Sequence, residues 1–174
     1  HPFSRHYLAE ILASFTVAEN LFELKEGSTK RNSETLAELY LRAVNAESNH
    51  QRQLYKKLGE TSLYISGFFG DSLNRKIVDF EYYSNMGAMA YHSLSQSVKE
   101  TNYSQLYGEF SSKFIVFADV LTLISQKYLR AETSSNLLGL FERYLSTGSD
   151  LAKDELNEKG VLSISPTSKN SNQH

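Results

Sequence analysis

Proline is confined to the two ends of this chain, at Pro2 and Pro166, and the whole stretch between them lacks it. Proline breaks helices, and it is common in the many turns of β-rich folds. A proline-free stretch of this length therefore favours helices joined by short loops over a turn-rich β fold. The sequence predicts an all-α protein, arranged as a single-domain antiparallel bundle of about five to seven helices.

Composition and charge narrow the class of protein further. The chain has 174 residues, of which 40% are hydrophobic and 22% charged, as in soluble globular proteins with a substantial core. The 18 basic and 20 acidic residues leave a formal net charge of −2, so we expect no nucleic-acid partner. Cysteine is absent, which excludes disulfides, thiolate metal sites and cysteine nucleophiles.

No segment reaches the roughly 18 consecutive apolar residues of a transmembrane helix, so we expect no transmembrane segment and a cytoplasmic protein. Because the chain begins with His1, removal of an upstream segment such as a signal peptide stays open. Residues 1–164 are expected to form the helical domain. The last ten residues, 165–174, are polar and are expected to be a mobile tail.

Apolar residues recur at helical spacing along most of the chain, between glycines and short polar side chains that are typical of helix ends. The expected elements are residues 4–26, 33–58, 61–69, 73–99, 103–129, 134–148 and 149–159. The clearest stripe runs along 103–129, where every step between apolar residues is three or four. We therefore expect that segment to be the central helix, with Phe114 and Phe117 in the middle of its buried face.

Helix 73–99 carries more apolar side chains than one buried face needs. Phe80, Ala88 and Tyr91 form one stripe, while Tyr82, Met86 and Met89 form a second. If helix 103–129 is central, the second stripe is exposed, and an exposed apolar patch on a soluble protein usually marks a partner site. The same residues would also suit simple core packing. The predicted interface, together with the preceding corner, comprises Phe68, Phe69, Tyr82, Tyr83, Met86 and Met89.

This surface suggests a non-enzymatic helical interaction or regulatory module that binds a second copy of itself, as a homodimer, or another protein. The small residues of the segment Met86-Gly-Ala-Met-Ala90 would alternatively leave room beside the helix for a small apolar ligand. The chain has no Gly-x-Ser-x-Gly motif, and no pair of catalytic carboxylates stands out. We expect no cofactor.

Glu47 and His50 form the Glu-x-x-His spacing that binds metal in carboxylate-bridged helical bundles, and Glu19 is a possible third ligand. The second copy of the motif is missing, because His92 has no glutamate three residues before it. An exposed helix centre is the favoured interpretation, and a metal-binding bundle stays as the alternative. His6 and Glu10, four residues apart, are expected to form a surface pair.

A glycine-containing corner, residues 66–72, precedes helix 73–99 and is followed by Arg75. Ser72, Arg75 and the free amides of the helix start would suit a phosphate or carboxylate. The corner lacks the Gly-Lys-Ser/Thr ending of a phosphate-binding loop. A tight turn between helices is therefore the favoured interpretation, and Ser72 with Arg75 is a possible anion site.

Overall fold

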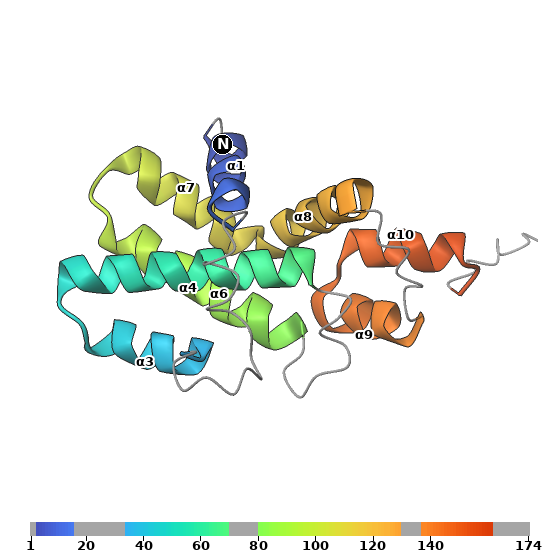
Figure 1. Cartoon of the computed structure of the whole chain (residues 1–174), viewed down its shortest axis with the longest axis horizontal. Coiled ribbons are helices and arrows are strands. Elements are labelled where there is room, and N and C mark those ends of the chain that lie inside the picture. The colour runs from blue at the N-terminus through green and yellow to red at the C-terminus, as the bar shows by residue number, and fades with distance from the viewer. Residues whose placement is uncertain (1–2, 16–33, 70–79, 130–136, 162–174) are drawn as a thin grey trace, which may run out of the picture.

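The structure is a computed structural model that describes residues 3–15, 34–69, 80–129 and 137–161 (Figure 1). All regular secondary structure in these ranges is α-helical, which confirms the predicted all-α class. Eight helices lie in the described ranges, more than the expected five to seven. Their bounds are α1 Ser4–Phe15, α3 Leu36–Asn45, α4 Ser48–Phe68, α6 Phe80–Ser97, α7 Thr101–Ser112, α8 Phe114–Leu129, α9 Leu137–Thr147 and α10 Asp150–Glu158.

Helix α4 is the central element of the described fold. It packs against α1, α3, α6 and α8, and the seven consecutive residues from Thr61 to Gly67 are all buried. The small residues Gly59, Ser62 and Gly67 on α4 let α6 and α8 approach it closely. In Figure 1, α1 crosses the direction of α4, so the described helices are not a simple antiparallel array. The central role that we expected for residues 103–129 is therefore wrong.

The boundaries of α3 and α4 also differ from the expected elements 33–58 and 61–69. The chain leaves the helical conformation at Ala46 and Glu47, both with ψ near 155°, and a new helix then continues to Phe68. Gly59 does not end this helix. A Cβ at Gly59 would lie 3.0 Å from the ring of Tyr91, so the glycine makes room for that ring. Its role is close packing rather than helix termination.

The predicted helix 103–129 is broken at Lys113, where φ is −117° and ψ is 28°. The Ser112 hydroxyl donates hydrogen bonds to the carbonyls of Gly108 and Glu109, at 2.9 and 3.3 Å, and such back-bonding bends helices. The apolar stripe nevertheless continues across the break. Phe114 is buried as expected, whereas Phe117 is half-buried and stacks on Phe110 with ring centres 4.0 Å apart.

Helices α9 and α10 form a hairpin with a small core of its own, made of Leu140, Ala152 and Leu156. The expected turn is confirmed, since Gly148 has a φ of +65° and Ser149 caps α10 by accepting from the Ala152 backbone N–H. Leu145 is 67% exposed, while Leu140 is buried.

The remaining elements agree with the sequence where they are described. In α1, Leu8, Ile11 and Phe15 are buried, as the stripe of helix 4–26 predicted, and residues 16–26 lie outside the described ranges. Helix α6 covers the described part of 73–99. The tail 165–174 also lies outside these ranges. Within them, none of the helices is long and apolar enough to cross a membrane.

Candidate functional site

The predicted interface on α6 is divided between core and surface. Tyr83 is only 2% exposed, so it belongs to the core and is not available to a partner in this conformation. Phe69 and Met89 are exposed, at 42% and 37%. The other three pack half-buried against the main core: Phe68, Tyr82 and Met86. The accessible part of this surface is therefore narrower than the sequence suggested.

The described part of the chain offers no third ligand for a metal site at Glu47 and His50. Glu47 precedes α4 as its N-cap residue and His50 lies in the first turn, and both are exposed. Glu19 lies outside the described ranges. Among the residues that are described, no three His, Asp or Glu side chains lie close enough together to hold a metal ion. The exposed surroundings agree with the favoured interpretation of this helix segment.

The candidate anion residues Ser72 and Arg75 both lie outside the described residues. The expected surface pair on α1 is confirmed, because His6 Nε2 lies 3.2 Å from Glu10 Oε1 and both side chains are exposed.

Helix α8 is apolar on two opposite faces. Its inner face packs into the core through Phe114, Ala118 and Leu121, which are all buried. Its outer face carries Val116, Val120 and Leu123, which are 54%, 36% and 50% exposed. These three residues, spaced four and three apart, form one stripe, which we call the outer α8 stripe. The spacing was readable in the sequence, but only the tertiary structure distinguishes this stripe from the buried one.

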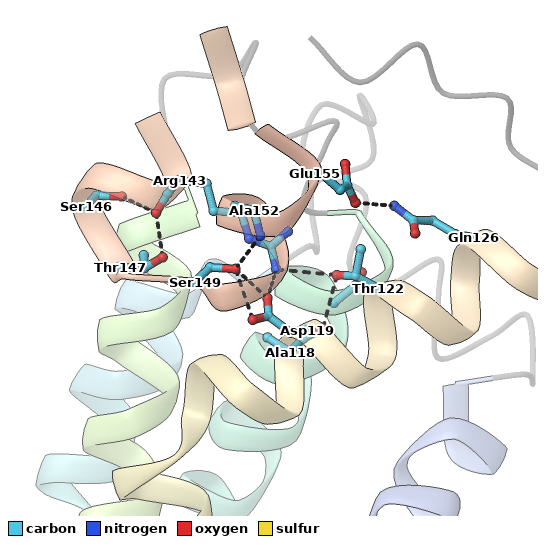
Figure 2. Close-up of polar contacts among 11 residues, drawn as sticks. Ala118, Asp119, Thr122, Gln126, Arg143, Ser146, Thr147, Ser149, Ala152 and Glu155 are labelled. Carbon is cyan, nitrogen blue, oxygen red and sulfur yellow. Dashed lines mark hydrogen bonds and ion pairs between the residues drawn. The ribbon is translucent and has the colours of Figure 1, made fainter. Parts of the chain in front are cut away.

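A buried ion pair joins α8 to the α9–α10 hairpin (Figure 2). Arg143 Nη2 donates a hydrogen bond to Asp119 Oδ1 at 2.5 Å, and the two side chains are only 4% and 13% exposed. The Ser149 hydroxyl donates to the same carboxylate at 2.9 Å while capping α10. One carboxylate thus holds an arginine from α9 and the start of α10.

The same arginine contacts α6 directly and is linked to α4 through Thr122 of α8. Its guanidinium lies 4.2 Å from the ring centre of Phe80 on α6, and Nη2 lies 3.5 Å from the hydroxyl of Thr122. Thr122 in turn donates to the Gly67 carbonyl of α4 at 2.9 Å. Because the charges are buried and paired with each other, we interpret the cluster as a structural connection. The sequence signal for it was Asp119, a lone charge after the apolar run 114–118, but its partner could not be inferred from spacing.

A second buried cluster consists of three tyrosines where α1, α4, α6 and α7 meet. Tyr7 donates to Glu60 Oε1 at 2.8 Å, and Lys56 Nζ lies 3.7 Å from the same oxygen. The rings of Tyr91 and Tyr107 stack with centres 6.1 Å apart, and Tyr7 meets both edge-on. Burial, with the nearby Glu60 carboxylate, raises the pKa of all three phenols, that of Tyr107 to about 12. The three hydroxyls are therefore uncharged at neutral pH.

Comparison of the chain with protein-family models, with curated proteins and with solved structures finds no match.

Proposed function

We propose that this protein is a non-enzymatic helical interaction module that pairs with a second copy of itself through the outer α8 stripe. The observation that carries the proposal is the exposure of Val116, Val120 and Leu123 on a helix whose opposite face is core. Three adjacent branched aliphatic side chains on one helix face form a ridge of the kind that packs against another helix. Burying that ridge in an interface removes apolar surface from water.

The spacing of the stripe favours self-pairing. When two copies of α8 pack antiparallel about a twofold axis beside Val120, that residue meets its own counterpart. Val116 of one copy then lies near Leu123 of the other, because the two are nearly equidistant from Val120 along the helix. A twofold interface needs such a self-complementary surface.

The charges at the ends of the stripe are compatible with this arrangement. Lys127 continues the same face one turn after Leu123, and Lys113 precedes the helix. Lys113 Nζ lies 3.0 Å from Glu109 Oε1. In the antiparallel pair, Lys127 of one copy lies opposite Lys113 of the other, because both are seven residues from Val120, and the Glu109 carboxylate that pairs with Lys113 offsets part of their repulsion.

The α6 surface predicted from the sequence remains a second candidate for the same function, centred on Met89 with the half-buried Met86 and Tyr82 beside it. A small apolar ligand beside α6 has less support, because both Tyr82 and Met86 already pack against the core. The two surfaces lie on different helices, so separate variants distinguish them.

Sedimentation velocity of the wild-type protein over a wide concentration range tests the proposal. We expect a reversible monomer–dimer equilibrium. Val120→Glu should weaken dimerisation at least tenfold, because the twofold axis would bury two carboxylates against each other. Val120 is already partly exposed in the monomer, so the circular dichroism spectrum of the Val120→Glu variant should match that of the wild type.

The matched control is Val44→Glu, which places the same charge on α3 at a valine that is 46% exposed. It should dimerise like the wild type. A wild-type protein that stays monomeric at every concentration would overturn the self-pairing proposal. So would a dimer that Val120→Glu does not weaken, or one that Val44→Glu weakens equally.

A further inference from the structure

A cavity of about 370 Å³ lies between α1 and the start of α7, away from the outer α8 stripe. Its size is within the range of small-molecule sites. Residues from the first helix and from the start of α7, far apart in sequence, meet here. They are Phe3, His6, Tyr7, Glu10, Asn102, Tyr103 and Leu106.

Three aromatic rings contribute to the wall of this cavity. Phe3 and Tyr103 are large aromatics that stay more than half exposed, at 51% and 55%. Tyr7 is buried and its ring is held in place, because its hydroxyl donates to Glu60 and its ring meets Phe110 edge-on at 5.0 Å. The aromatic surface is therefore partly pre-organised and partly open to solvent.

The cavity is lined by one carboxylate beside an imidazole. Of the described lining residues, Glu10 is the carboxylate and none is a lysine or arginine. Behind the wall, both Glu60 and Glu10 help to raise the pKa of Tyr107, after the larger effect of burial. Lys56 Nζ lies 5.9 Å from the ring centre of Tyr7 and pairs with Glu60. Lys56 thus offsets Glu60, and Glu10 faces the cavity with the imidazole of His6.

We infer that this cavity binds a small organic cation with a quaternary or alkylated ammonium group. Aromatic faces attract such cations through the ring quadrupole, and a carboxylate at the rim adds direct charge attraction. The alkyl groups of the cation would contact Phe3, Tyr103 and Leu106. The Asn102 side chain offers a hydrogen-bonding group for a hydroxyl or carbonyl elsewhere on the ligand.

Choline is a suitable probe, with its uncharged carbon isostere 3,3-dimethylbutan-1-ol as the comparison ligand. Titration of the full chain, followed by NMR chemical shifts or calorimetry, should give saturable choline binding. We expect the isostere to bind about tenfold more weakly, since it has the same shape but no charge. Glu10→Gln and Tyr103→Leu should each weaken choline binding about fivefold or more. Both positions are exposed, so the variants should fold.

Matched controls change the same residue types elsewhere. Glu81→Gln on α6 and Phe69→Leu at the end of α4 alter an exposed carboxylate and an exposed aromatic ring, and both should bind choline like the wild type. Equal binding of choline and its isostere would overturn the cation assignment and leave an apolar pocket. Absence of saturable choline binding, or choline binding that neither Glu10→Gln nor Tyr103→Leu weakens, would overturn the site itself.

Discussion

Gly67 of α4 and Leu121 of α8 meet so closely that a Cβ on the glycine would lie 2.3 Å from the leucine Cβ. The same contact is reinforced by the Thr122 hydroxyl, which donates to the Gly67 carbonyl at 2.9 Å. Position 67 therefore needs glycine because of Leu121, which lies 54 positions further along the chain. Gly67 does not interrupt α4, which continues to Phe68. This close approach is what allows α4 to serve as the central helix.

Gly67→Ala should destabilise the protein by about 1–3 kcal/mol, because the added methyl group forces α4 and α8 apart. Urea denaturation measures the difference. Gly108→Ala is the matched control, since its Cβ would meet nothing nearer than Ser95 Cβ at 4.0 Å. That variant should stabilise the protein by about 0.5–1 kcal/mol through helix propensity. Equal effects at the two positions would contradict the packing argument.

The two phenylalanines at the start of α8 should differ in their contribution to stability. Phe114 is 3% exposed and packs beside Gly87, so Phe114→Ala should cost about 3–5 kcal/mol. Phe117 is half-buried and its ring stacks on Phe110, so Phe117→Ala should cost clearly less. Thermal unfolding of both variants tests the order. An unchanged melting temperature for Phe114→Ala would show that α8 is packed differently.

Removing one partner of the buried ion pair should be costly. In Arg143→Met the Asp119 carboxylate stays buried without its cation, and we expect a loss of about 3–5 kcal/mol. Arg42→Met is the control, because Arg42 pairs with Glu34 on the surface, where ion pairs contribute little. In the double variant Asp119→Leu with Arg143→Met, part of the stability should return. A double variant as unstable as the sum of the single ones would show that the two residues are not coupled.

Alkaline pH should unfold the protein through the tyrosine cluster. Tyr7, Tyr91 and Tyr107 have folded-state pKa values above the ordinary value of 10.0, and that of Tyr107 is about 12. Folding thus favours the protonated phenols, so their contribution is complete below pH 10 and is lost as the pH rises through the folded-state values. Between about pH 10 and 12, unfolding free energy should fall by about 4 kcal/mol per pH unit for the three groups together.

Urea denaturation at a series of alkaline pH values measures this slope. Tyr107→Phe should reduce it by about a third, because one of the three titrating groups is gone. A slope that Tyr107→Phe leaves unchanged would place the alkaline sensitivity elsewhere.

The α6 stripe predicted from the sequence can be separated from the outer α8 stripe by two variants. Tyr82→Glu with Met86→Glu should lower stability, because both side chains pack against the core. Met89→Glu, at a position that is 37% exposed, should change neither stability nor dimerisation. If the double variant instead keeps its stability and becomes monomeric, the dimer interface is on α6.

Local patterns account for the parts of the fold that the sequence determined by itself. The proline-free stretch predicted helices, and steps of three and four residues identified the inward face of α1, with Leu8, Ile11 and Phe15. The turn between α9 and α10 was equally readable, because Gly148 and Ser149 act within a few residues of their own position. Helix propensity, capping and amphipathic spacing are all short-range properties.

Only the tertiary structure decided which helix is central, which glycines end a helix and which apolar stripe stays exposed. Gly59 looks like a helix end in the sequence and Gly67 like part of a turn, yet each makes room for a side chain from a distant helix, Tyr91 or Leu121. The stripes of α8 have the same spacing on both faces, and the choice between them depends on which face meets α4. Such choices depend on contacts between segments far apart in the chain, and helical periodicity carries no information about them.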